Sequence, residues 1–143
     1  MKISDILRTK GFDVVTVPPQ FALLDAMRLL VEHNIGSLVV AEDKSVEGII
    51  TERDILRLGA DDPQHFRTKA VEEVMTKDVV VGVPGDSLEY VMEIMTQNRI
   101  RHLPVVDDGW LEGILSIGDV VNALRSRVEA ENRHLRDYIT GRA

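Results

Sequence analysis

The chain contains the stretch GIITERD at residues 48–54 and, 65 positions later, the stretch GILSIGD at residues 113–119. Each begins with a short apolar run and continues with a hydroxyl side chain that an aspartate follows three residues later. This spacing is typical of a helix N-terminus, where the two side chains cap free backbone N–H groups. The sequence therefore predicts two places at which a strand passes directly into a helix.

The similarity extends well beyond these two stretches. The same shift aligns residues 14–57 with residues 79–122 without a gap, and thirteen of those 44 positions are identical. Residues 3–7 also resemble residues 71–75. Self-similarity of this kind is the signature of a repeated structural unit. We expect repeats at residues 1–60 and 70–124, a link over residues 59–69, and a C-terminal helical extension over residues 125–143.

Each repeat is predicted to have the order β-α-β-β-α. Short β-branched runs closed by proline or glycine indicate strands, helical spacing of apolar residues indicates amphipathic helices, and paired apolar runs around a turn indicate hairpins. Neither half alone covers both faces of its strands, so we expect an α+β fold with the two repeats packed about a pseudo-twofold axis. The expected elements are strands 14–17 and 79–83, helices beginning at Leu23 and Leu88, hairpins 37–41 with 46–50 and 103–106 with 111–115, and helices beginning near Thr51 and Ser116.

The segment from Asp119 to about Ile139 contains no proline or glycine and predicts one long helix. Its apolar residues follow alternating three- and four-residue steps, with Glu131 interrupting them. Such a helix extends beyond its own repeat, so its stripe of apolar side chains either packs back on the two repeats or forms a dimer contact. The stripe consists of Val121, Leu124, Val128, Leu135 and Tyr138.

Composition excludes several classes of protein. The 143 residues carry a net charge of −7, which disfavours non-specific binding to nucleic acid because such binding depends on cations that neutralise phosphates. There are no cysteines, so disulfides, thiolate catalysis and cysteine-based metal sites are excluded. No apolar run approaches the ~18–20 residues of a membrane span, and the N-terminus does not look like a secretory signal. We therefore expect a cytoplasmic location.

The repeated hydroxyl–acid pair permits two interpretations. In the first, Thr51 and Ser116 are helix caps that Asp54 and Asp119 complete, and nothing more. In the second, the same groups also bind a ligand, because a helix N-terminus offers N–H donors and a positive dipole to a phosphate. A carboxylate in the first turn can then accept both hydroxyls of a ribose.

The residues before the second strand of each repeat differ in charge. Arg101 and His102 precede that strand in the second repeat, and either they belong to a solvated turn or they neutralise a phosphate. Gly36 and Ser37 replace them in the first repeat, where small side chains would allow a base to approach the backbone. Arg53 could supply the missing cation there, so the two half-sites are not equivalent.

The duplicated motif, after an Ile-x-x-Leu-apolar-Val strand, resembles a tandem pair of CBS domains, also called a Bateman module, over the chain through about residue 124. The resemblance implies two clefts between the repeats that bind adenosine compounds, namely AMP, ADP, ATP, NAD or S-adenosylmethionine. It implies that Asp54 and Asp119 hold the ribose and that Thr51 and Ser116 supply hydroxyl contacts. It further assigns phosphate contacts to Arg101 and His102. The remaining expected ligand residues are Thr16, Val17 and Val81 in the first strands, with Gly36, Ser37, Arg53 and Pro104.

The sequence thus predicts a regulatory module that is not an enzyme, because no nucleophile stands beside a general base at a known spacing. We expect an adenine nucleotide as ligand, no required cofactor or metal, a homodimer, an unidentified regulated protein as partner, and no nucleic acid. The alternative is a ligand-free interaction module in which the motif only caps helices. A third possibility, an enzyme of unrecognised chemistry, would show itself by turnover of a nucleotide.

Overall fold

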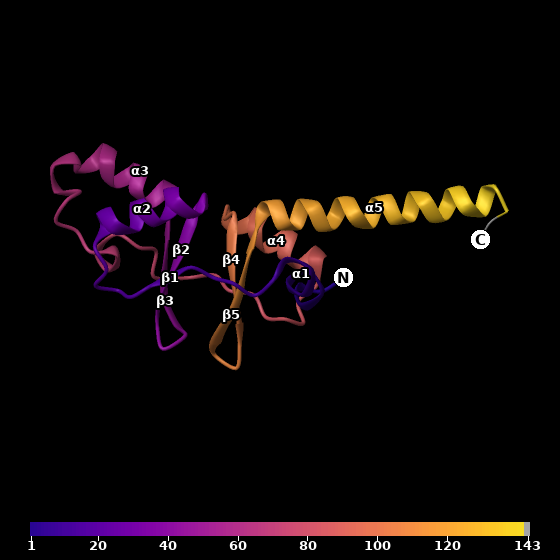
Figure 1. Cartoon of the computed structure of the whole chain (residues 1–143), viewed down its shortest axis with the longest axis horizontal. Coiled ribbons are helices and arrows are strands. Elements are labelled where there is room, and N and C mark those ends of the chain that lie inside the picture. The colour runs from indigo at the N-terminus through magenta and orange to yellow at the C-terminus, as the bar shows by residue number, and fades with distance from the viewer. Residues whose placement is uncertain (142–143) are drawn as a thin grey trace.

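The computed structural model describes residues 1–141. Two similar units lie side by side, and one long helix extends away from them (Figure 1). No helix within residues 1–141 is long and apolar enough to cross a membrane. In chain order the elements are α1 Ile3–Lys10, β1 Thr16–Val17, α2 Leu23–His33, β2 Ser37–Glu42, β3 Ser45–Thr51, α3 Glu52–Asp61, η1 Pro63–His65, η2 Val71–Glu73, α4 Leu88–Asn98, β4 His102–Asp107, β5 Trp110–Ser116 and α5 Ile117–Ile139.

The α+β architecture expected from the repeat is confirmed. Both hairpins, β2–β3 and β4–β5, are antiparallel, and each ladder shifts register at the same point, after Val40 and after Val105. Helices α3 and α5 begin directly after the hairpins, as the repeated motif predicts. Two elements differ from expectation: α1 was not predicted as a helix, and the expected link is partly occupied by the end of α3 and by η1.

The expected strand at residues 79–83 is wrong. In the first repeat β1 pairs with β2 in parallel, and the N–H of Val39 donates to the carbonyl of Val15 at 3.3 Å. In the second repeat only an isolated bridge joins Gly82 to Val105. The residue equivalent to Val39 is Pro104, which has no N–H to donate. The parallel ladder therefore cannot extend, although the side chains of residues 79–83 favour a strand.

The two hydrophobic cores exchange their leading segments. Ile3, Ile6 and Leu7 of α1 belong to the core of the second repeat, where they pack with residues such as Leu88 and Leu103. Val71 of η2 lies in the core of the first repeat. Backbone hydrogen bonds fix both crossings, from Ile3 N–H to the Asp86 carbonyl (2.9 Å) and from Val71 N–H to the Phe21 carbonyl (2.9 Å). Each repeat therefore needs the segment that precedes the other one.

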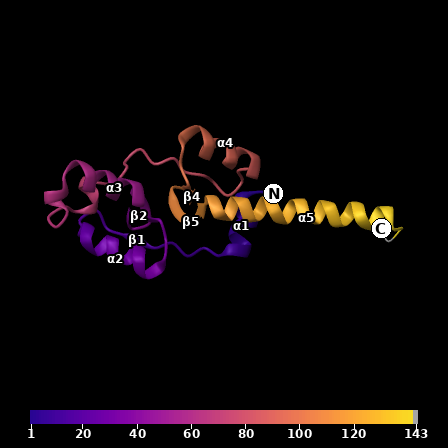
Figure 2. The ribbon, with the colours of Figure 1, turned by 90° about the horizontal axis from the view of Figure 1, so that it is seen from above.

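The hairpins of the two repeats also touch. The N–H of Leu111 donates to the carbonyl of Lys44 at 2.8 Å, and β3 contacts β5. Glycines permit the close packing of the exchanged segments, because a Cβ at Gly48 would lie 2.9 Å from the carbonyl oxygen of Thr76 and a Cβ at Gly113 would lie 2.9 Å from a methyl group of Leu7. Figure 2 shows the two units side by side, with α5 leaving the second.

We predict that Gly48→Ala destabilises the fold. The added methyl group collides with the backbone of the exchanged segment, which cannot move aside as a flexible side chain could, and overpacking of this kind costs about 1–3 kcal/mol. Urea unfolding measures the loss. Gly85→Ala is the matched control, since a Cβ there meets nothing within 4 Å. Equal stability of the two variants would contradict the close contact.

Candidate functional site

The two helix starts are built alike. At α3 the N–H of Asp54 donates to Thr51 Oγ1 (3.2 Å), and both the N–H and the hydroxyl of Thr51 donate to Asp54 Oδ2 (3.0 and 3.1 Å). At α5 the N–H of Asp119 donates to Ser116 Oγ (3.2 Å), and the N–H and hydroxyl of Ser116 donate to Asp119 Oδ2 (2.8 and 3.0 Å). The predicted capping role is therefore confirmed at both positions. In each case the cap uses only one carboxylate oxygen.

The other carboxylate oxygen has different surroundings in the two repeats. Asp54 Oδ1 accepts a hydrogen bond from Thr76 Oγ1 at 3.3 Å. Asp119 Oδ1 accepts no hydrogen bond from any of residues 1–141. Of the two acids, Asp119 therefore has the oxygen that is available to a ligand.

A pocket of about 390 Å³ lies between the repeats beside Asp119. The start of α5 forms one wall, and the turn between α2 and β2 forms another. This size falls within the range of small-molecule sites, which are about 300–1,000 Å³. The pocket is lined by Lys10, Asp13, Val14, Val15, Asn34, Ile35, Gly36, Ser37, His102, Ile114, Ser116 and Asp119.

Lys10 supplies a cation to this pocket. Its Nζ lies 2.6 Å from Asp119 Oδ2 and also donates to the carbonyl of Ile114. Burial raises the pKa of Asp119, but the hydrogen bonds from Lys10 and from the Ser116 backbone outweigh it, and the pKa lies below its usual value. Asp119 is therefore an anion at neutral pH, and Lys10 is its counter-ion.

His102 enters the pocket as a neutral ring. Burial lowers its pKa, and the nearby Glu52 carboxylate only partly opposes this. A Cβ at Gly36 would lie 3.2 Å from the ring, so glycine leaves room for the imidazole. His102 can offer a hydrogen bond to a ligand at neutral pH, but it adds no positive charge.

The pocket brings together five of the residues expected from the sequence, namely Gly36, Ser37, His102, Ser116 and Asp119. Thr51 and Asp54 form the other helix start, with Arg53 exposed on α3. Arg101 is exposed and does not line the described pocket. Val17 and Pro104 are buried, and Val81 is exposed.

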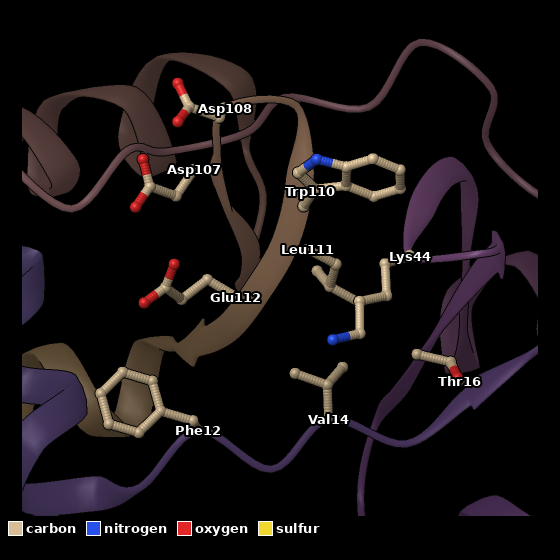
Figure 3. A pocket seen from close by; sticks show the side chains of 9 residues that line it. All are labelled: Phe12, Val14, Thr16, Lys44, Asp107, Asp108, Trp110, Leu111 and Glu112. Atoms are coloured by element: carbon tan, nitrogen blue, oxygen red, sulfur yellow. The ribbon is translucent and has the colours of Figure 1, made fainter.

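Thr16 lines a different hollow, of about 950 Å³, between the hairpin tips (Figure 3). Phe12 and Trp110 lie at its edges, with Lys44 between them and Asp107, Asp108 and Glu112 on one side. It contains no helix start and no hydroxyl–acid pair. We therefore place the candidate ligand site in the smaller pocket beside Asp119.

Sequence reasoning missed Lys10, Asp13, Val14 and Val15 as pocket residues. The available signal was the similarity of residues 3–7 to residues 71–75, which aligns Leu7 with Met75. Leu7 packs against Gly113 of the second repeat, and Met75 packs against Gly48 of the first repeat. This crossing brings the end of α1 to the start of α5.

We predict that Lys10→Met raises the pKa of Asp119 towards its ordinary value, because the variant loses the ammonium group that stabilises the anion. A carboxyl titration followed by NMR measures the change. The stability that ionised Asp119 provides is present above the unfolded-state pKa of about 3.9 and is lost as pH falls through the lower folded-state value. The variant should therefore lose less stability than the parent over this acidic window. Lys44→Met is the control, and an unchanged Asp119 pKa in Lys10→Met would contradict the assignment.

Comparisons with known proteins agree with this architecture. The model of the family described as "CBS domain" matches residues 3–61 and again residues 71–126. A mitochondrial CBS domain-containing protein of Arabidopsis thaliana, CBSX3, is 34% identical over 148 residues, which cover 97% of this chain and 72% of the relative.

Solved structures are similar over most of the chain. The crystal structure of a CBS-domain protein of Agrobacterium tumefaciens, ATU1752, is 43% identical with a TM-score of 0.83, covering 86% of this chain and 98% of that one. CBSX2, solved in complex with AMP, is 32% identical with a TM-score of 0.73, covering 87% and 96%. The CBS pair of MJ0100, solved with 5-methylthioadenosine and S-adenosylmethionine, is 26% identical with a TM-score of 0.77, covering 89% and 98%.

Proposed function

The chain belongs to the CBS domain family as a tandem pair of CBS domains, and from this premise we propose that it is a regulatory module that binds an adenosine ligand beside Asp119. The observation that carries the proposal is the pocket between the repeats, in which one carboxylate oxygen of Asp119 accepts no hydrogen bond from residues 1–141. Relatives of the same fold have been solved with AMP and with 5-methylthioadenosine and S-adenosylmethionine.

The pocket offers complementary chemistry for a ribose. Asp119 Oδ1 can accept a hydroxyl hydrogen bond without any loss of the cap, because the cap uses Oδ2. The valines that precede β1 supply an apolar wall with backbone groups for the adenine.

The charges in the pocket favour one phosphate group. Lys10 is the only Lys or Arg among the lining residues, whereas Asp13 and Asp119 are acidic and His102 is neutral. The N-terminus of α5 adds the positive end of a helix dipole. We therefore expect AMP to bind more tightly here than ADP, ATP or NAD, with Lys10 turning from Asp119 to the phosphate.

The ligand would act by bridging the repeats. Gly36 and Ser37 come from the first repeat, and Ser116 and Asp119 come from the second. A ligand that touches both can favour one relative arrangement of them, to the extent that it binds that arrangement better. A regulated protein that reads this arrangement, a homodimer and the absence of catalysis all belong to the proposal. The cytoplasmic location stays a prediction, since one relative is named as mitochondrial.

We predict that AMP raises the thermal stability of the parent protein and that Asp119→Ala abolishes this shift. A ligand present at 100 times its dissociation constant contributes about 2.7 kcal/mol. Differential scanning fluorimetry with AMP, ADP, ATP, NAD, S-adenosylmethionine and 5-methylthioadenosine gives the order of preference. Asp119→Ala also loses its cap, at about 1 kcal/mol, so the readout is the ligand-induced shift and not the starting stability.

Asp54→Ala is the matched control, because it removes an equivalent capping box at α3 but leaves the Asp119 pocket intact. It should lose similar starting stability and keep the AMP shift. No shift with any of the six ligands would count against the proposal, as would a full AMP shift in Asp119→Ala.

A second candidate function is a ligand-free interaction module. Two contacts favour it, since Lys10 neutralises Asp119 and Thr76 bonds the remaining oxygen of Asp54. Under this hypothesis both alanine variants lose only cap energy, and no adenosine compound changes the unfolding temperature of the parent.

A further inference from the structure

We propose that the hollow between the two hairpin tips binds a segment of a regulated protein in which an arginine stands beside apolar residues. This hollow is called the tip groove below. The inference rests on the proposed function in so far as a regulatory module needs a partner, but the groove itself requires no adenosine ligand. The tip groove is lined by Phe12, Val14, Thr16, Lys44, Asp107, Asp108, Trp110, Leu111 and Glu112.

Two aromatic side chains lie half exposed at the edges of the tip groove (Figure 3). Phe12 is 50% exposed and Trp110 is 54% exposed. Val14 and Leu111, which are partly buried, continue the apolar surface between them. Apolar side chains that are exposed together in this way, with polar groups around them, mark a site of interaction.

The repeated fold does not require these aromatic residues. At the same 65-residue shift that relates the repeats, Trp110 corresponds to Ser45 and Phe12 corresponds to Lys77. Both hairpins nevertheless have the same register up to their turns. A serine therefore suffices beside such a turn, and a binding role accounts for the tryptophan.

The charges of the tip groove complement a cation. Asp107, Asp108 and Glu112 contribute three carboxylates, whereas Lys44 is the only Lys or Arg among the described lining residues. None of these four groups belongs to an ion pair within residues 1–141. Figure 3 shows the carboxylates on one side of the groove and Lys44 on the other. The acidic side therefore attracts a cation from another molecule and repels nucleic acid and anionic membranes.

An arginine side chain matches both features of the tip groove. Its planar guanidinium group can stack on an aromatic face and can also donate paired hydrogen bonds to a carboxylate. Lysine supplies the same charge without the planar donors. Arginine and tryptophan are also both enriched among the residues that contribute most to protein interfaces.

The size and exposure of the tip groove favour a protein segment over a small organic cation. Its volume is about 950 Å³, whereas small-molecule sites are about 300–1,000 Å³ and enclose most of their ligand. A small cation would leave much of the two aromatic side chains in water. A peptide can cover both of them and place its arginine against the acidic side.

The walls of the tip groove are held by two tight turns. The turn residues have positive φ angles between 50° and 80°, as two-residue hairpin turns require, namely Asp43, Lys44, Asp108 and Gly109. The N–H of Leu111 donates to the carbonyl of Lys44 at 2.8 Å and joins the two hairpins. The groove is therefore preorganised, which lowers the entropic cost of binding.

The tip groove shares one wall with the proposed ligand site. Val14 lines both the groove and the pocket that contains Asp119. A partner in the groove would therefore contact the same chain segment as a ligand in that pocket.

Peptide titrations of the full chain test the proposal. The probes are fluorescein-labelled peptides of four Gly-Arg-Leu, Gly-Lys-Leu or Gly-Glu-Leu repeats, and binding is followed by fluorescence anisotropy. We expect the arginine peptide to bind at least about threefold more tightly than the lysine peptide, and the glutamate peptide not to bind. Since Trp110 is the only tryptophan of the chain, its own fluorescence should change when the unlabelled arginine peptide binds.

Two variants locate the binding, and neither changes a core residue. Trp110→Ser, which introduces the residue of the first repeat, should weaken binding of the arginine peptide about tenfold. Asp107→Asn combined with Glu112→Gln should weaken it to a similar extent. The matched control is Glu42→Gln with Glu47→Gln, which removes the same charge from the equivalent positions of the first hairpin, outside the tip groove. This control should bind the peptide as the parent protein does.

Four results would overturn the proposal. They are no binding of the arginine peptide, equal affinity for the arginine and lysine peptides, equal weakening by the double variant and its control, and binding of agmatine as tight as that of the peptide. Sedimentation equilibrium adds a fifth, since a dimer lost in Trp110→Ser would show that a second copy fills the groove. The AMP-induced thermal shift is measured without peptide, so failure of AMP binding and failure of peptide binding are distinguishable.

Discussion

The exchange of leading segments between the two cores holds the molecule together and shapes its pocket. Ile3 and Leu7 are completely or almost completely buried in the second repeat, and Val71 is completely buried in the first. Burial of such side chains contributes about 1.5–3 kcal/mol each, and here that energy is gained only when both repeats are present. The repeats are therefore mutually dependent halves of one fold. Because α1 must cross to the far repeat, its last residue, Lys10, reaches Asp119.

The two half-sites differ, although their helix caps are alike. The first repeat has Gly36 at the position that Arg101 occupies in the second repeat. This glycine leaves room for the His102 ring. Pro104 removes a ladder hydrogen bond that Val39 makes, so the segment at residues 79–83 is held by a single bridge. The Asp119 pocket contains one lysine and a neutral histidine, whereas Arg101 is exposed and does not line this pocket. The two similar helix caps therefore lie in chemically different surroundings.

Lys10 gives the proposed ligand site a means of response. It bonds both Asp119 and the carbonyl of Ile114, and it lies at the end of a helix whose Ile3, Ile6 and Leu7 are buried in the second core. A ligand that binds Asp119 in place of Lys10 leaves the ammonium group without its anion. A phosphate group on the ligand can replace that anion, whereas an uncharged nucleoside cannot. The same helix contacts the base of α5.

The repeat, the hairpins, the two capped helix starts and the long final helix were all determined by sequence alone, because each rests on local spacing of apolar, turn and capping residues. The pairing of Ser116 with Asp119 is of this kind, since three residues of one chain segment form it. What only the tertiary structure decided is which segments cross between repeats, and hence that Lys10, Asp13 and Val14 meet Asp119. It also decided the failure of the strand at residues 79–83, because the missing N–H belongs to Pro104 on the neighbouring strand. Such contacts depend on the packing of residues far apart in the chain, which local spacing does not encode.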